Sequence, residues 1–315
     1  MKHVFIINPA SGANDHEKEI REILSSSGRL SQCEIHVTES PEEATEFVDN
    51  WCRRHREAVR FYACGGDGTL NEVIAGMMGH PEASVACYPC GSGNDFVKYY
   101  GGKENFMDIP ALMDADEVVI DAIRVADHYS VNVTNFGFDT KVCVAMAKYR
   151  HKPLIGGKNA YTAALVANFF SGMRTKVKLT VDGEVIHDGD ILLCTVANAQ
   201  YIGGSYRCAP FSSNDDGYLD VCLVKPISRI QLLKLIKSYE KGEHLNDPRF
   251  KDLIIYRRAQ KIHIEGEEDF CITVDGETFS CPTPDIEILP KSIRLALPAH
   301  AKNAVNIREG SPITE

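Results

Sequence analysis

The stretch YACGGDGTLNE, residues 62–72, joins a strand-like run to a helix-like run through three glycines. A buried strand is predicted before it at 58–64, and a helix is predicted after it at 69–79. Glycine-rich turns of this kind present backbone N–H groups to an anion. The lysine of a Walker A loop is missing, and Asp67 at the centre of the turn would repel a phosphate. A Mg²⁺ ion between Asp67 and the phosphates of a nucleotide would remove this conflict. The alternative is an Asp-Gly turn that only closes the junction.

Strands and helices alternate on both sides of this turn throughout the first third of the chain. The predicted strands are 3–9, 33–40, 58–64 and 83–89, and the predicted helices are 16–28, 41–55 and 69–79. This order predicts a parallel sheet covered by helices, with ligands beyond the carboxyl ends of the strands. A second glycine turn, CGSGNDF at 90–96, follows the fourth strand at that same edge. Thr69 in the first turn is expected to cap the following helix or to touch a phosphate oxygen.

The pattern changes after about Asp121 to short runs of period two separated by hairpin turns. This pattern predicts an antiparallel β-rich region, interrupted by helices at 159–173 and 228–242. The predicted organisation is an α/β nucleotide-binding domain at 1–122 and a β-rich substrate domain at 123–298. The polar tail at 299–315 follows, and its return to the N-terminal domain is left open.

The amino-acid composition limits the kinds of molecule that the protein is expected to bind and the cell compartment in which it is expected. A formal net charge of −10 argues against nucleic acid. The eleven cysteines are scattered and odd in number, which favours reduced thiols in the cytoplasm. No apolar run approaches the roughly 18 residues of a membrane span.

One segment departs from the acidic composition of the chain. Between Thr140 and Val181 there are eight Lys and Arg residues and no Asp or Glu. Such a segment predicts a basic face for anionic lipid headgroups. The apolar helix at 159–173, which contains Phe169 and Phe170, would either meet the bilayer there or pack in the core.

Three motifs in a fixed order resemble the diacylglycerol kinase catalytic domain: NPASG (8–12), GGDGTLNEV (65–73) and GSGNDF (91–96). The resemblance is to the soluble bacterial lipid kinases, which are related to sphingosine and ceramide kinases. It covers nearly the whole chain and implies an α/β nucleotide-binding domain followed by a β-sandwich domain, with ATP in the cleft between them. The ATP contacts that it implies are Asn8, Thr38, Gly65, Gly66, Asp67, Gly68, Thr69, Leu70, Asn71, Glu72, Gly91, Ser92 and Asn94. Ser92 replaces a more usual Thr and keeps the hydroxyl.

The resemblance also implies a structural Mg²⁺ loop in SSNDDGYLD, residues 212–220. Its ligands would be the Asp216 side chain and the backbone carbonyls near Ser213 and Tyr218. Clustered acids in a glycine turn suit a hard cation with oxygen ligands. A hairpin turn at Asp-Gly is the alternative.

The string VDGE occurs twice, at 181–184 and 274–277, so by itself it indicates a hairpin and nothing more. The second copy stands where the family has its catalytic acid pair. By the resemblance, Asp275 accepts the proton of the lipid hydroxyl and Glu277 lies beside the Mg²⁺-nucleotide, with Asp67 as a third catalytic acid. The first copy is predicted to be a plain turn.

The implied function is transfer of the γ-phosphate of ATP, with Mg²⁺, to the hydroxyl of a diacylglycerol-like lipid, giving phosphatidic acid or a related lipid phosphate. The implied setting is a cytoplasmic enzyme bound peripherally to a membrane surface, with a homodimer left open. One alternative is an NAD kinase-like enzyme, which shares GGDGT but lacks the order of the other two motifs. A phosphofructokinase-like enzyme is a weaker alternative. A non-catalytic nucleotide or lipid sensor on the same scaffold is a further one.

Overall fold

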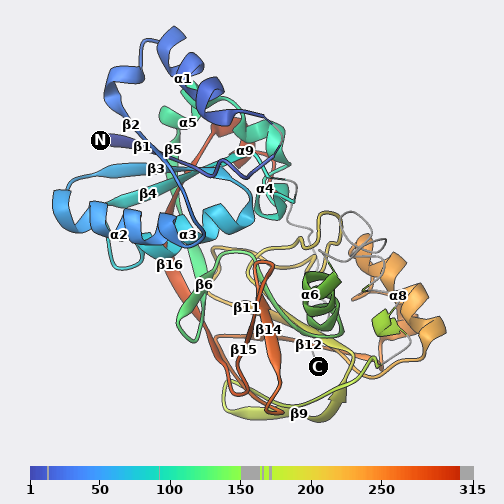
Figure 1. Ribbon diagram of the computed structural model, residues 1–315. Coiled ribbons are helices and arrows are strands. Elements are labelled where there is room, and N and C mark those ends of the chain that lie inside the picture. Colours follow the sequence, from blue (N-terminus) through green and yellow to red (C-terminus); the bar gives the residue numbers. More distant parts are fainter. Residues whose placement is uncertain (13, 92, 150–163, 165–166, 170–171, 306–315) are drawn as a thin grey trace. The chain divides into compact units, whose positions relative to one another are not determined.

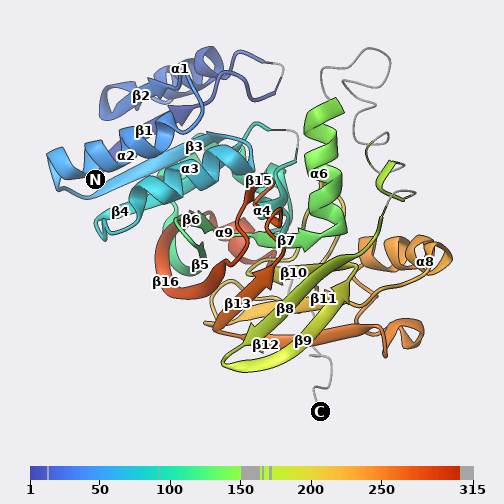
Figure 2. The same ribbon diagram turned by 60° about the horizontal axis from the view of Figure 1, so that its bottom comes forward.

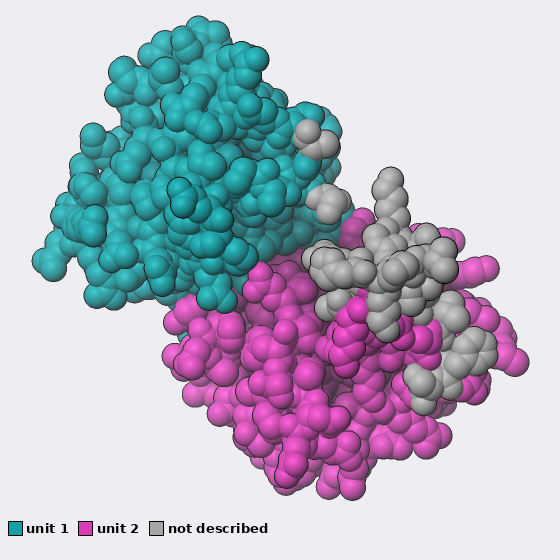
Figure 3. All heavy atoms as spheres, viewed as in Figure 1, with its two compact units in different colours: residues 1–122, 214–216, 289–307 teal, residues 123–213, 217–288, 308–315 magenta. Residues whose placement is uncertain are grey.

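A computed structural model describes the chain except residues 13, 92, 150–163, 165–166, 170–171 and 306–315. The chain divides into two compact units (Figure 3). Unit 1 contains residues 1–122, 214–216 and 289–307, and unit 2 contains residues 123–213, 217–288 and 308–315.

Unit 1 is built on four parallel strands in the order β2-β1-β3-β4. The strands are β1 (Lys2–Ile7), β2 (Cys33–Val37), β3 (Val59–Gly65) and β4 (Ala83–Pro89). The helices are α1 (His16–Ser26), α2 (Glu43–His55), α3 (Asp67–Met77), α4 (Asp95–Lys98), α5 (Ile109–Met113) and α9 (Ala299–Lys302). In Figure 1, α1 and α5 lie on one face of the sheet, and α2 and α3 lie on the other. Every residue of β3 and β4 is buried, because parallel strands are covered on both faces.

Unit 2 is a two-sheet β-sandwich. One sheet has the order β12-β11-β10-β7-β14-β15, and the other includes the start of β16 (Asp285–Leu297) followed by β13, β8 and β9. Its strands are β6 (His128–Ser130), β7 (Val133–Gly137), β8 (Thr175–Val181), β9 (Glu184–Ile191), β10 (Leu193–Ala197), β11 (Leu219–Val224), β12 (Ile254–Ala259), β13 (Lys261–Gly266), β14 (Cys271–Val274) and β15 (Glu277–Ser280). Apolar side chains from both sheets, among them Phe136, Leu179 and Ile272, form one core. The fold class predicted from the sequence is therefore confirmed.

Two helices pack outside the six-stranded sheet of unit 2, α6 (Phe138–Tyr149) and α8 (Arg229–Glu240) (Figure 2). A capping box of Ser228 and Gln231 begins α8. Of the predicted helix at 159–173, Ala164 is buried and Phe169 packs against the same cluster. Tyr161, Leu165 and Phe170 lie outside the described residues, so the bilayer alternative for them stays a prediction.

Two segments that the sequence analysis assigned to the β-rich domain belong to unit 1. The strand β16 (Asp285–Leu297) pairs antiparallel with β13 at its start, but Leu295 pairs in parallel with Val85 of β4. Residues 214–216 also belong to unit 1, where Asp121 N donates to Asn214 O at 2.7 Å. The unit boundary in the structure therefore differs from the predicted range 123–298 at these two segments, and β16 pairs with one strand in each unit. The strand β5 (Asp116–Val125) is divided in the same way.

No helix among the described residues has an apolar run long enough to cross a bilayer.

Candidate active site

The two glycine turns of unit 1 touch at the carboxyl ends of β3 and β4. The carbonyl oxygen of Gly65 accepts hydrogen bonds from Cys90 N at 2.8 Å and from Gly91 N at 3.2 Å. A Cβ added to Gly91 would lie 2.5 Å from the Cα atom of Gly66. Only glycine at position 91 therefore allows the two turns to approach this closely.

The NPASG loop after β1 joins the same edge of the sheet. Asn8 N donates to Cys64 O at 3.1 Å, and Asn8 Nδ2 donates to Thr69 Oγ1 at 3.1 Å. Gly12, with φ of +75°, comes so close to Cys90 that an added Cβ would lie 2.7 Å from its carbonyl oxygen. The three motifs that carry the resemblance are thus gathered at one end of the parallel sheet.

Three more of the predicted ATP contacts, Thr38, Leu70 and Glu72, have definite positions in unit 1. Thr38 follows β2, and its N–H donates to Ile7 O at 2.9 Å. Leu70 is buried in the core, so only its backbone is available to a ligand. Glu72 is half-buried on α3. Ser92 lies outside the described residues.

The N-terminus of α3 has no side-chain cap. The N-cap residue is Gly66, and Thr69 is the third helical residue, with its hydroxyl accepting a hydrogen bond from Asn8. The prediction that Thr69 caps the helix is therefore wrong, because the helix begins two residues earlier than its apolar spacing suggests. The first amides of an eleven-residue helix can bind an anion here.

Asp67 anchors the first glycine turn to the second. Its Oδ2 accepts from Asp95 N at 3.0 Å, and its Oδ1 accepts from Phe96 N at 3.1 Å. Burial raises the pKa of Asp67, and these two hydrogen bonds oppose that rise. Each oxygen keeps lone-pair capacity for a water or a cation. The anchoring role is one that the sequence analysis missed, because no local pattern shows which amides a carboxylate will meet.

Two side-chain amide oxygens at this edge are available to accept a hydrogen bond from a ligand or to bind a hydrated cation. The Oδ1 atoms of Asn71 and Asn94 are buried and accept no hydrogen bond from the described residues. Asn94 adopts φ of +49°, and its Nδ2 donates to Gly91 O at 2.6 Å, which directs the oxygen of the amide away from that carbonyl. Oxygen atoms of this kind are ligands that Mg²⁺ and its bound waters accept.

Both VDGE copies in unit 2 form hairpins of the same backbone conformation. Asp182 and Gly183 have φ of 48° and 87°, and Asp275 and Gly276 have φ of 44° and 94°. Positive φ at both central residues is the mark of a type I′ turn. The hairpin that the sequence predicts is present in each copy.

The two aspartates also make similar contacts. Asp182 accepts from Lys261 N at 2.8 Å and from Gln260 N at 3.1 Å. Three groups donate to the Asp275 carboxylate: Ser130 Oγ at 2.7 Å, Val133 N at 2.9 Å and Val131 N at 3.1 Å. Glu277 is exposed, and no hydrogen bond to its side chain is found among the described residues.

A partly buried carboxyl group that the sequence analysis missed lies in the first turn of α6. Burial raises the pKa of Asp139 to about 7. Thr140, which follows it, accepts a hydrogen bond from Thr273 Oγ1 of β14 at 3.0 Å. A cavity of about 580 Å³ adjoins this turn. Its lining includes apolar groups (Val144, Ala145 and Phe270), three lysines (Lys141, Lys148 and Lys176) and two acids (Glu267 and Asp269).

The predicted metal loop, residues 212–220, contains a turn whose side chains include oxygen atoms that could bind a metal ion. Asp216 is exposed, Ser213 is buried, and Tyr218 is 40% exposed beneath the guanidinium of Arg258. The Asn214 side chain holds the loop to unit 1 by donating to Tyr100 Oη at 2.8 Å. An exposed carboxylate suits a hard cation, and the ligand set of Asp216 with the backbone carbonyls near Ser213 and Tyr218 stays a prediction.

Two glycine substitutions test the contact between the turns. Gly91→Ala is expected to destabilise unit 1 by about 1–3 kcal/mol, because the added methyl group overlaps backbone that cannot move aside. Gly66→Ala is the matched control: its Cβ would lie 3.5 Å from Gly91 Cα, an ordinary contact. Urea denaturation of both variants measures the difference, and equal stabilities would contradict the close approach.

Known protein families match both parts of the chain. The diacylglycerol kinase catalytic domain matches residues 2–125, and the YegS C-terminal NAD kinase beta sandwich-like domain matches residues 132–297. The chain belongs to the diacylglycerol kinase family. It is a lipid kinase, as the resemblance of its three motifs predicted.

Relatives and solved structures agree with this assignment. A diacylglycerol kinase of Bacillus subtilis is 28% identical over 287 residues, covering 88% of this chain and 90% of that protein. The crystal structure of a diacylglycerol kinase from Bacillus anthracis has the same fold, with a TM-score of 0.69 and 21% identity over 95% of this chain and 98% of that one. An NAD kinase from Archaeoglobus fulgidus in complex with ATP has a TM-score of 0.50 and 15% identity, with 96% of each chain covered. The wider fold is therefore shared with NAD kinases.

Proposed function

We propose that this lipid kinase transfers the γ-phosphate of ATP, with Mg²⁺, to the hydroxyl of a diacylglycerol-like lipid and so forms phosphatidic acid or a closely related lipid phosphate. The observation that carries the proposal is the contact between the glycine turns at Gly66 and Gly91, beside the uncapped N-terminus of α3. Backbone amides without nearby Cβ atoms allow phosphate oxygens to come close. The relatives named diacylglycerol kinase support the choice of lipid.

Unit 1 supplies the binding of the nucleotide phosphates in this proposal. No lysine occurs in either glycine turn, so the helix amides need a cation to neutralise the triphosphate. Asp67, Asn71 and Asn94 have the oxygen atoms that would hold hydrated Mg²⁺ there. When bound, the ion would neutralise charge that develops on the transferring phosphoryl group.

Unit 2 supplies the acid pair of the hairpin between β14 and β15. The lipid oxygen forms a bond to the γ-phosphorus while the bond to the β–γ bridging oxygen breaks, and ADP leaves. The sequence analysis assigned the lipid proton to Asp275, but that carboxylate already accepts three hydrogen bonds. We therefore assign the proton to Glu277, which is exposed, and give Asp275 the task of fixing the turn. Placement of ATP between the two units stays a prediction.

The lipid acceptor has a suitable site within unit 2. The cavity beside α6 combines apolar groups such as Val144 and Phe270 with three lysines and two acids, Glu267 and Asp269. The apolar part of the cavity would hold an acyl chain, and the lysines would be attracted to an anionic membrane surface. Lys148, one of these three lysines, is exposed, and so is Arg174, which pairs with Asp190 at 3.4 Å; their exposure supports peripheral binding to a membrane. All eleven cysteines are free thiols, in keeping with the proposed cytoplasmic location.

An acceptor panel tests the proposed function. Turnover of ATP is measured with Mg²⁺ and, separately, diacylglycerol, sphingosine, ceramide or NAD in mixed micelles. Phosphorylated diacylglycerol is the expected product, and omission of Mg²⁺ is expected to remove it. Phosphorylation of NAD in place of any lipid would overturn the proposal, since the fold is shared with NAD kinases.

A further inference from the structure

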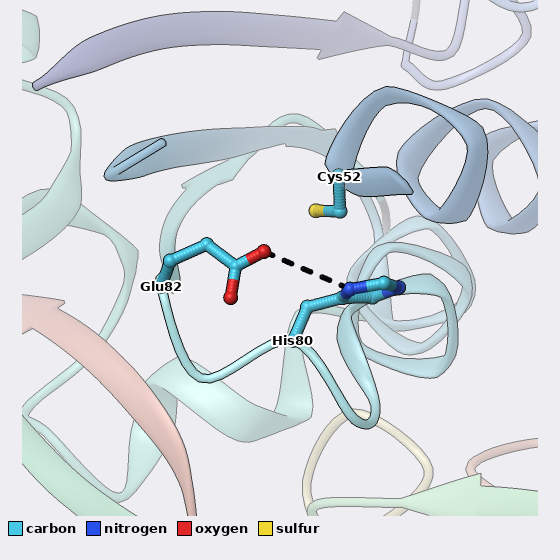
Figure 4. A group of neighbouring side chains, drawn as sticks. All are labelled: Cys52, His80 and Glu82. Atoms are coloured by element: carbon cyan, nitrogen blue, oxygen red, sulfur yellow. Dashed lines mark ion pairs between the residues drawn. The ribbon is translucent and has the colours of Figure 1, made fainter. Parts of the chain in front are cut away.

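A group of metal-ligating side chains lies in unit 1 on elements that the proposed reaction does not use. Cys52 comes from α2, and His80 and Glu82 come from the turn between α3 and β4 (Figure 4). One ligand atom from each lies within 4.8 Å of the other two. Figure 4 shows all three side chains directed toward a common space.

The turn holds His80 and Glu82 in place. Ala83 N donates to His80 O at 3.1 Å, so residues 80–83 form a tight turn with Pro81 at its second position. Proline there fixes φ close to the value that the turn requires. The backbone of the turn therefore directs the side chains of His80 and Glu82, at its first and third positions, toward α2. Their placement does not depend on contact between the two side chains.

The distances between the ligand atoms fit coordination of a metal ion better than direct hydrogen bonds between the side chains. His80 Nδ1 and Glu82 Oε1 are 3.8 Å apart, within the distance of an ion pair (dashed line in Figure 4) but too far for a hydrogen bond. Two nitrogen or oxygen ligands of one tetrahedral Zn²⁺ lie about 3.4 Å apart, and a sulfur ligand lies roughly 3.6 Å from either. Rotation of the side chains that moves each ligand atom by less than about 1–1.5 Å would bring all three atoms within bonding distance of one ion.

The second nitrogen of His80 is already occupied in the manner usual for a metal ligand. His80 Nε2 lies 2.9 Å from Asp49 Oδ1, and the carboxylate can only accept, so the proton of the neutral ring is on Nε2. This arrangement leaves the lone pair of Nδ1 facing Cys52 and Glu82. The Arg53 guanidinium, and then His80, hold the pKa of Asp49 below its usual range, which keeps this partner ionised.

We propose that Cys52, His80 and Glu82 bind one Zn²⁺ ion, with Asp49 orienting His80. A mixed sulfur, nitrogen and oxygen set favours zinc over the hard cation of the kinase reaction. His80 and Glu82 have side chains that are 16% and 27% exposed, which leaves a path for the ion and room for a water as fourth ligand. The ion would join α2 to the turn before β4 and so stabilise unit 1.

Metal binding by the full chain tests the proposal. Protein stripped with a chelator is titrated with ZnCl₂ alone, without nucleotide, and a parallel sample receives CoCl₂. One Zn²⁺ per chain, a thiolate-to-cobalt absorption band and a higher thermal midpoint with zinc are expected. Cys52→Ala and His80→Gln should each weaken zinc binding at least about 10-fold and abolish the cobalt band or shift it.

Two further variants keep the test decisive. Glu82→Gln alters a partly exposed side chain and should weaken zinc binding without unfolding the protein. His36→Gln is the matched control, because His36 Nε2 lies 3.0 Å from Glu43 in the same unit, and His36 belongs to no metal-ligating group of three among the described residues. Zinc affinity that is unchanged in Cys52→Ala and Glu82→Gln, or no cobalt–thiolate band in the unaltered chain, would overturn the proposal. Either result leaves the lipid-kinase assignment untouched, because ATP turnover is not measured.

Discussion

Glu277→Gln is expected to lower kcat by about 10²–10⁴-fold, the range of a general base. The side chain is exposed at the start of β15, so its replacement should leave the free energy of unfolding within about 0.5 kcal/mol of the unaltered protein. Glu184→Gln is a matched control, because it makes the same change at the same position of the other VDGE hairpin. Its kcat should be nearly unchanged. ATP turnover with diacylglycerol, measured beside urea denaturation, separates loss of chemistry from loss of fold.

Asp275→Asn completes this prediction by testing the anchor of the hairpin. An Asn oxygen can still accept from Ser130 and Val133, but its NH₂ group would face the amide of Val131. Activity should fall by roughly 10²-fold or more, together with about 1–3 kcal/mol of stability. Asp182→Asn should do little, because Gln260 N and Lys261 N both donate to one oxygen that Asn retains. Equal losses in the two copies would show that the second hairpin has no special part in catalysis.

Asp67→Ala is the second change with a large expected effect. It leaves the amides of Asp95 and Phe96 without their acceptor, at a cost of about 1–3 kcal/mol for each buried donor. The contact between the two glycine turns should loosen, and ATP affinity should fall at least about 10-fold. Calorimetric titration with ATP and urea denaturation of the same preparation give both quantities.

Chelation of Mg²⁺ distinguishes the two tasks assigned to Asp67. If the carboxylate also reaches a hydrated cation, ATP should bind the unaltered protein at least about 10-fold more weakly in excess EDTA, and Asp67→Asn should bind ATP with little dependence on Mg²⁺. Asn keeps one acceptor for the helix amides, so its stability loss should be smaller than that of Ala. ATP that binds equally well with and without divalent cations would leave Asp67 as an anchor only.

Much of this site follows from local sequence. The strand before Gly65, the helix after Gly68 and the second turn at 90–96 were all predicted, because buried runs and glycines act over a few residues. The same holds for both VDGE hairpins. The start of α3 was placed two residues late, since the apolar spacing of a helix does not show where its first amides lie.

Long-range contacts account for what was missed. Nothing near Asp67 indicates that it would accept from Asp95 and Phe96, and nothing near Ser130 indicates a bond to Asp275, 145 residues away. The division of β16 between the two units likewise depends on Leu295 meeting Val85. The cluster of Cys52, His80 and Glu82 has no spacing typical of a metal motif and arises only when α2 lies beside the turn before β4.

The sequence by itself therefore determined the family, the order of strands and helices, and the glycines that let backbone approach backbone, because each of these depends on neighbouring residues and on steric limits of single positions. Only the tertiary structure decided which carboxylates are occupied by amides, which remain exposed, and which side chains from distant segments share a ligand. The physical reason is that hydrogen bonds and coordination require atoms within about 3–4 Å, and packing of whole elements sets those distances.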